Sequence, residues 1–142
     1  MMNSTGNLSF VETASAEAKR LEPFGRWATL LKTRKRDGSW VATPVNLAVD
    51  GDRAYFGAPA NTGKVKRLRN FDEVEITPCS PRGTPKGPTL KARARRLEGA
   101  EAAAAHRALV RKHHIVHRLI VPLELKLRRT SNVLYEVRSA GS

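Results

Sequence analysis

Residues 27–57, WATLLKTRKRDGSWVATPVNLAVDGDRAYFG, contain the pattern that decides the fold class. Two Asp-Gly dipeptides, at positions 37–38 and 50–51, interrupt segments of alternating apolar and polar residues. Asp-Gly favours the tight turns that join neighbouring antiparallel strands. The stretch therefore predicts an antiparallel meander of three strands, over residues 27–34, 40–49 and 53–57.

The rest of the chain extends this pattern. In residues 89–97 small or apolar side chains alternate with basic ones, so we expect Ala92 and Ala94 inside and Arg93 outside. Residues 119–127 fit either a strand or a short helix. The fold class that follows is mainly β (α+β), a six-stranded antiparallel barrel with a few peripheral helices. Further strands are predicted over residues 73–79, 89–97 and 132–137, and helices over 14–21, 64–70 and from 99 to 113 or 117. Residues 1–13 are expected to be loosely attached, and 14–142 to form a single domain.

Charge narrows the range of partners. The 142 residues contain 26 Lys and Arg against 13 Asp and Glu, a formal net charge of +13, which attracts polyanions. Only 6% of residues are aromatic, so nucleic-acid bases would find few stacking surfaces, and no DNA- or RNA-binding motif occurs. We therefore expect no nucleic-acid partner, and an anionic cofactor is the competing interpretation of the charge.

Cellular context follows from what the sequence does not contain. Cys79 is the single cysteine, which fits a reducing compartment. The first ten residues lack the pattern of a secretory signal, and no apolar run approaches the length of a membrane span. We expect a cytoplasmic protein with no membrane partner.

Residues 57–64, GAPANTGK, lie between a predicted strand and a predicted helix. The spacing has one residue too many for a nucleotide-binding P-loop, and the surrounding strands are antiparallel. An N-cap at Asn61 or Thr62, a flexible Gly63 and Lys64 would still form an anion site at a helix start. The nearby basic residues would add charge to this site, although a solvated basic helix explains them as well: Lys66, Arg67 and Arg69.

Two further features are candidates for ligand contact. Pro44 interrupts a predicted strand, so it marks an edge, a bulge or a point where the backbone faces a ligand. Lys32, Arg34 and Arg36 are two residues apart and share a strand face. That face either follows an extended polyanion or is plain solvent-exposed surface.

Four histidines, His106, His113, His114 and His117, stand on the alanine-rich helix or just after it. His113 and His117 have the i,i+4 spacing of metal ligands, but no carboxylate is placed to complete a site. A solvated helix end is the favoured interpretation, haem ligation is a minor alternative, and we assign no metal ligand. No catalytic side-chain arrangement is found either, so any reactivity would come from a bound cofactor.

Three stretches together resemble a known family. Residues 29–45, residues 61–68 (NTGKVKRL) and residues 78–83 (PCSPRG) resemble the pyridoxamine-phosphate-oxidase-like split β-barrels, and more narrowly their F420-dependent oxidoreductases. The similarity covers residues 24–138. It implies a split barrel that forms a homodimer, with the cofactor in a groove between subunits. Apolar side chains in residues 119–127 and in the last strand, more than a small barrel can cover, also predict a dimer.

The resemblance also implies roles for individual residues. The cofactor phosphate would be held by Thr62, Gly63 and Lys64, with Lys66 or Arg67 in support. Thr43, Pro44 and Val45 would line the ring system, and the loop Cys79, Ser80 and Pro81 would lie nearby. Lys32, Arg34 and Arg36 would meet the acidic tail of coenzyme F420.

The function expected from this resemblance is hydride transfer between reduced F420 and a small-molecule substrate. An alternative is a non-enzymatic binding or carrier protein for flavin (FMN), haem or a linear tetrapyrrole. A third, nucleic-acid binding, would show as a steep salt dependence of affinity.

Overall fold

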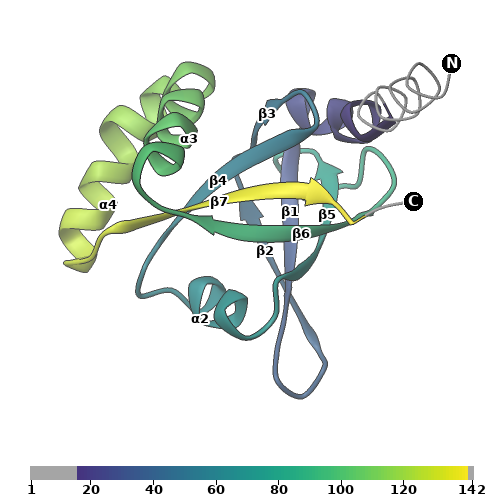
Figure 1. Cartoon of the computed structure of the whole chain (residues 1–142), viewed down its shortest axis with the longest axis horizontal. Coiled ribbons are helices and arrows are strands. Elements are labelled where there is room, and N and C mark those ends of the chain that lie inside the picture. The colour runs from purple at the N-terminus through teal and green to yellow at the C-terminus, as the bar shows by residue number, and fades with distance from the viewer. Residues whose placement is uncertain (1–15, 141–142) are drawn as a thin grey trace, which may run out of the picture.

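A computed structural model describes residues 16–140 of the chain. In this part of the chain, seven strands form one antiparallel sheet that curls into a half-barrel, with helices at its periphery (Figure 1). The predicted fold class is confirmed, with seven strands in place of six. The segment 1–13, which is predicted to be loosely attached, lies outside the described residues. In the order β2-β1-β5-β6-β7-β4-β3, the strands are β2 (Trp40–Val45), β1 (Ala28–Arg34), β5 (Glu73–Cys79), β6 (Leu90–Leu97), β7 (Asn132–Ser139), β4 (Arg53–Pro59) and β3 (Ala48–Asp50).

Both Asp-Gly turns are present. Gly38 (φ 89°) lies between β1 and β2, and Gly51 (φ 63°) lies between β3 and β4. A Cβ is strained at these angles, which explains the glycines. In the first turn the backbone N–H of Ser39 donates to Asp37 Oδ1 over 2.9 Å, which fixes the hairpin.

The seventh strand arises because the predicted strand 40–49 is divided. Pro44 lies opposite Leu30 of β1. Since proline has no N–H to donate, it is tolerated here because β2 is an edge strand. After Val45 the chain leaves β1 and, as β3, pairs with β4 at the other end of the strand order. Residues 46–47 thus connect the two edges of the sheet.

The helices differ from expectation at two places. The first helix runs over residues 16–26 of the described part, past the predicted end at Pro23. Leu21 and Phe24 on it are fully buried in the barrel core, and this packing outweighs the cost of an internal proline. Residues 119–127, which fitted either a strand or a helix, are helical. The remaining helices are α2 (Gly63–Asn70), α3 (Gly99–Lys112), the π-helical turn η1 (Val116–Ile120) and α4 (Val121–Arg128).

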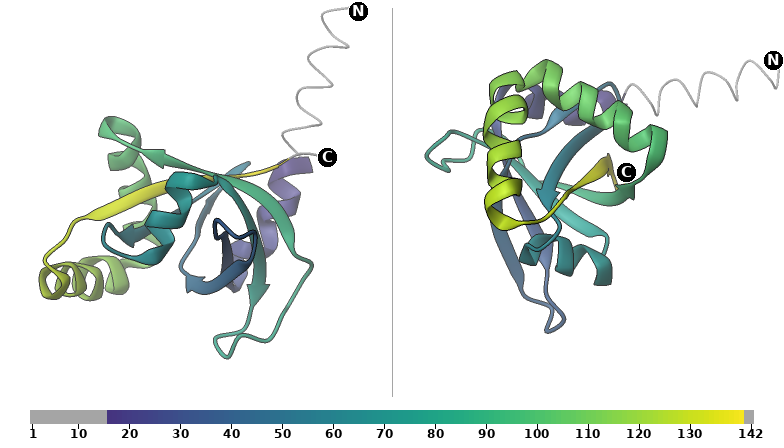
Figure 2. Two further views of the ribbon diagram at one scale, coloured as in Figure 1. Left: turned by 90° about the horizontal axis from the view of Figure 1, so that it is seen from below. Right: turned by 90° about the vertical axis from the view of Figure 1, so that its left-hand side faces the viewer.

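The sheet is packed on both faces. One cluster fills the barrel and includes Phe56 and Tyr135, whose rings stack with centroids 5.0 Å apart. A second cluster lies under α3, where Ala105 and Leu109 contact Tyr55, Leu97 and Leu134 of the outer sheet face. Figure 2 shows α3 and α4 together on one side of the sheet. No helix within residues 16–140 is long and apolar enough to cross a membrane.

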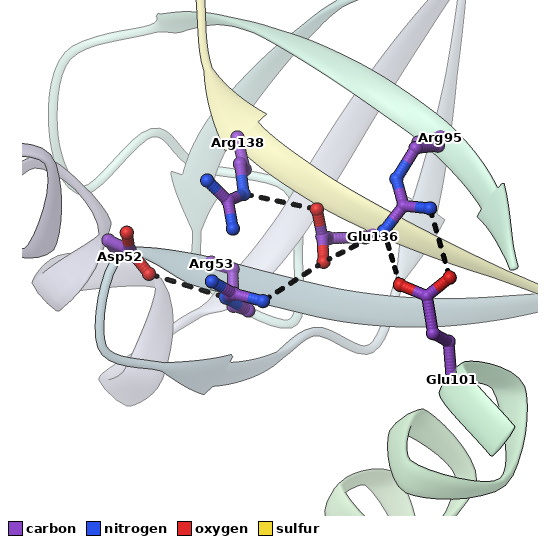
Figure 3. A network of polar contacts seen from close by, with 6 residues as sticks. All are labelled: Asp52, Arg53, Arg95, Glu101, Glu136 and Arg138. Carbon is purple, nitrogen blue, oxygen red and sulfur yellow. Dashed lines mark hydrogen bonds and ion pairs between the residues drawn. The ribbon is translucent and has the colours of Figure 1, made fainter.

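A polar network ties β4, β6, β7 and α3 together (Figure 3). Glu136 of β7 is only 5% exposed and accepts from Arg53, Arg95 and Arg138 over 3.0–3.4 Å. Arg95 also pairs with Glu101 of α3 over 2.6 Å. Because a buried carboxylate needs compensation, these three guanidinium groups let Glu136 lie within the sheet. None of the residues of this network lines the cavity described next.

Candidate cofactor-binding site

A cavity of about 230 Å³ lies where the end of β2 meets β4, α2 and the η1–α4 segment. Its position follows from the topology, because the link after Val45 brings the two edges of the sheet together here. The wall is apolar on several sides and has five polar side chains. The residues that line it are Pro44, Val45, Asn46, Gly57, Pro59, Lys64, Val116, His117, Ile120, Val121, Glu124 and Asn132.

Three of the predicted site residues line this cavity: Pro44, Val45 and Lys64. Pro44 therefore lies on an edge strand, which was one of the three predicted alternatives, and it also lines the cavity. Lys64 is half-buried. Burial lowers the pKa of its ammonium group, and Arg67 and Arg128 lower it further, whereas Glu124 acts to raise it. A bound anion beside Lys64 would offset the cost of burying its ammonium group and the repulsion from Arg67 and Arg128.

The N-cap of α2 is Thr62, which is one of the two predicted residues. No side chain forms a capping hydrogen bond with the first turn of the helix. Thr62 Oγ1 instead donates to the Pro59 carbonyl over 2.8 Å. Asn61 Nδ2 donates to the Arg128 carbonyl at the end of α4 over 3.2 Å. Asn61 and Thr62 thus hold the loop in place, and the first turn of α2 stays without a side-chain acceptor.

Arg67 covers this first turn. Its Nη1 lies 2.6 Å from the position that a Cβ on Gly63 would occupy, so only glycine allows the guanidinium group this close. Its Nε donates to Thr33 Oγ1 of β1 over 2.6 Å, which fixes the side chain. Lys66, by contrast, is exposed. The structure therefore gathers Lys64 and Arg67 at the helix start and leaves Lys66 in solvent.

Other predicted residues do not line the cavity. Thr43 is half-buried, and its Oγ1 has no hydrogen-bond partner among the described residues. Cys79 is buried at the end of β5, and Ser80 bonds with Thr84 inside its own loop. Lys32 is half-buried on β1 and is not among the lining residues, and Arg36 and Pro81 are exposed.

Arg34, the last of the predicted contacts, is held by aromatic rings. Its guanidinium group lies 5.9 Å from the ring centroid of Trp40 and 5.4 Å from that of Phe71. These cation–π contacts explain its half-buried state.

His117 is a functional candidate that the sequence analysis considered and set aside. It lines the cavity and is only 6% exposed, so the prediction of a solvated histidine is wrong at this position. Neither Nδ1 nor Nε2 has a hydrogen-bond partner among residues 16–140. Burial, and then the nearby His113 and His106, lower its pKa, which keeps the imidazole neutral. His106 and His114 are exposed as predicted.

A signal for His117 was present in the sequence. It stands four residues after His113, in the stretch 115–121, where Arg118 is the only other polar residue. The π-helical turn there adds a residue to the helix, and Pro122 follows at the beginning of α4, where it cannot donate an N–H to the preceding turn. Such turns frequently occur at functional sites.

Gly57, Glu124 and Asn132 were also not predicted. The Asn132 side chain lies 2.6 Å from the position of a Cβ on Gly57, so the glycine makes room for the amide. Within the described residues, no group of three metal-ligating side chains occurs. The cavity thus offers a cationic group at Lys64 with the Glu124 carboxylate nearby, a neutral imidazole, two amides and apolar walls. Lys64 can contact an anionic group of a ligand, and the apolar walls can pack against its apolar part.

Comparisons with solved structures agree with this fold. A putative pyridoxamine 5'-phosphate oxidase from Listeria innocua matches with a TM-score of 0.61 at 16% identity, over 88% of this chain and 94% of that one. HutZ, the haem storage protein from Vibrio cholerae, matches with a TM-score of 0.66 at 11% identity, over 87% of this chain and 90% of that one. An F420-H2-dependent reductase, FDR-A, matches with a TM-score of 0.57 at 13% identity, over 80% of this chain and 95% of that one.

The chain is a split β-barrel of the pyridoxamine-phosphate-oxidase-like fold. It spans about half the length (48%) of another structural neighbour, the Agrobacterium tumefaciens protein Atu2129 of unknown function, at 23% identity. No protein-family model matches the chain, and no curated protein matches its sequence. A shared fold does not determine function, so the site itself must indicate what the chain binds.

Proposed function

We propose that the chain binds coenzyme F420 at this cavity and acts as an F420-dependent oxidoreductase on a small molecule. The observation that carries the proposal is the start of α2, where Lys64 and Arg67 gather at an uncapped helix start. Backbone N–H groups and the positive end of the helix dipole favour a phosphate there. FDR-A, which shares the fold, is described as an F420-H2-dependent reductase.

The residues of the site divide into two roles. Lys64 and Arg67 would hold the phosphate, and Gly63 would allow it to approach the backbone. Pro44 and Val45 would pack against the ring system and exclude water from one of its faces. The deazaflavin itself supplies the hydride chemistry, so the protein needs to bind, orient and desolvate. Lys32 and Arg34 remain the proposed contacts of the acidic tail.

We also propose a homodimer, as the resemblance implies. A cavity of about 230 Å³ is below the roughly 300–1,000 Å³ usual for ligand pockets, so a deazaflavin would project beyond it. A second subunit would then cover the projecting part. Analytical ultracentrifugation tests this proposal, and a monomer at micromolar concentration would contradict it.

The cofactor is tested by titrating the purified protein with F420 and with FMN. F420 should bind more tightly, because only its tail offers further carboxylates to basic residues. Each exposed pair contributes ~0.2–1 kcal/mol, so the preference should be modest and should decrease with added salt. Equal or tighter FMN binding at low salt would contradict the proposal.

His117 favours one second candidate, a haem-binding protein. Metal ions usually need several protein ligands, but a porphyrin brings four nitrogen ligands, so one neutral imidazole suffices to hold its iron. HutZ, with the same fold, is described as a haem storage protein.

Haemin titration of the wild type and of His117→Ala tests this candidate, with His114→Ala, an exposed histidine nearby, as the control. Haem binding predicts a shifted Soret band that is lost only in His117→Ala. Three identical spectra would eliminate it.

A further inference from the structure

The η1–α4 segment presents apolar side chains to solvent that the fold does not use. None of the eight residues of α4 is buried, and α4 lies on the outside of the molecule, at the left of Figure 1. The exposed fractions of the five large apolar side chains are between 53% and 76%. We call these residues the apolar stripe: Ile115, Leu119, Ile120, Leu123 and Leu127.

The stripe is continuous along the helix. Four of its members are spaced by four residues, which places each one turn above the last. Leaving five such side chains in water is unfavourable, and exposed apolar patches of this kind usually mark an interaction surface.

The charges beside the stripe indicate the partner. Residues 111–129 contain six Lys and Arg but one acid, Glu124, which pairs with Arg128 over 3.2 Å. Arg118 and Lys126 are exposed within the same stretch as the stripe. An apolar surface bordered by cations fits the interface of an anionic bilayer, where acyl chains accept the leucines and headgroups accept the charges.

A second copy of the chain fits this surface less well. A twofold interface brings the same patch of both subunits together, so the basic residues beside the stripe would face each other. Like charges across an interface are unfavourable. The sequence predicts no membrane partner because no apolar run in it is long enough to span a bilayer. That observation excludes a membrane-spanning helix, but it does not exclude a helix that lies on the membrane surface.

We propose that the η1–α4 segment docks the protein on anionic phospholipid membranes, with the apolar stripe inserted and the neighbouring cations at the headgroups. Ile120 belongs to the stripe and also lines the cavity, so docking places this one wall at the membrane surface and leaves the other walls to the proposed second subunit. The proposal is independent of which cofactor the cavity binds.

Co-sedimentation of the full chain with vesicles tests it. Vesicles that mix phosphatidylglycerol with phosphatidylcholine should bind the protein, and pure phosphatidylcholine vesicles should bind it at least tenfold more weakly. The double variant Leu119→Gln/Leu123→Gln should reduce binding at least tenfold. Arg118→Gln/Lys126→Gln should reduce it about fivefold per residue.

The control variant Lys35→Gln/Arg107→Gln removes the same charge from exposed sites elsewhere and should bind within twofold of the wild type. Circular dichroism checks that each variant folds, which is expected because the changed residues are exposed. No vesicle binding, equal binding to both vesicle types, or equal loss in the control would overturn the proposal. So would conversion of a dimer into a monomer by Leu119→Gln/Leu123→Gln, which would assign the stripe to a second copy.

Discussion

Strand β7 and helix α4 are neighbours in the chain and have regularly spaced apolar residues, yet their surroundings differ completely. All five residues from Val133 to Val137 are buried, whereas α4 has no buried residue. β7 lies between β6 and β4, with the barrel core on one face and α3 over part of the other. The expectation that both segments expose apolar surface is therefore wrong for β7 and right for α4. Apolar periodicity indicates which face will be covered, but not whether the same chain covers it.

The comparison is tested most strongly by one substitution in each element. Leu134 of β7 is 8% exposed and Leu127 of α4 is 76% exposed. Leu134→Ala should lower the free energy of unfolding by ~2–5 kcal/mol, because it leaves a cavity under α3. Leu127→Ala should change it by less than ~0.5 kcal/mol. Urea denaturation of both variants measures the difference, and similar losses would show that α4 is covered by the chain itself.

The polar part of β7 gives a second test. Glu136→Gln should lower the free energy of unfolding by ~1–3 kcal/mol, because three guanidinium groups lose their shared carboxylate within the sheet. The control is Asp72→Asn, whose carboxylate pairs with Arg93 over 3.0 Å with both side chains more than half exposed. Such a pair is worth ~0–1 kcal/mol. Urea denaturation measures both variants. If both lose the same free energy of unfolding, the burial of Glu136 does not determine how much its ion pairs stabilise the fold.

In the segment that precedes α4, His117 should make stability depend on pH. Its pKa in the folded state is below the usual 6.5, so the unfolded chain binds the proton more readily. The contribution to stability is therefore complete above pH 6.5 and is lost as pH falls toward the lowered value. Thermal unfolding midpoints at pH 7.5 and 5.5 should differ less in His117→Leu than in the wild type. His114→Leu is the control and should behave like the wild type; an unchanged pH dependence in His117→Leu would refute the assignment.

The sequence was most informative where local chemistry decides the structure. Asp37-Gly38 and Asp50-Gly51 mark their turns because a positive φ favours glycine at any such turn. The alternation of Ala92 and Ala94 with Arg93 correctly predicts the buried side of β6. Residues 61–64 similarly mark a helix start, where backbone N–H groups are free in any fold.

The cavity could be predicted only in part, because segments far apart in the sequence form it. Lys64 and Pro44 have local signals, but His117, Glu124 and Asn132 reach the cavity through the path of α4 and the register of β7 with β4. The division of strand 40–49 after Val45 likewise depends on the partner strand β4. Such long-range packing leaves no fixed spacing in the sequence.

The central claim, that the cofactor phosphate binds at the start of α2, is tested most directly by the F420 dissociation constants of Lys64→Ala and Lys35→Ala at one ionic strength. A hydrogen bond to a charged group is worth ~1.5–3 kcal/mol, so Lys64→Ala should bind F420 roughly 10- to 150-fold more weakly than the wild type. Lys35 is exposed and away from the cavity, and its variant should bind normally. The free Lys64→Ala protein should unfold at the same or a slightly higher temperature, because it loses a desolvated charge. Equal dissociation constants for the two variants would contradict the claim and place the phosphate elsewhere.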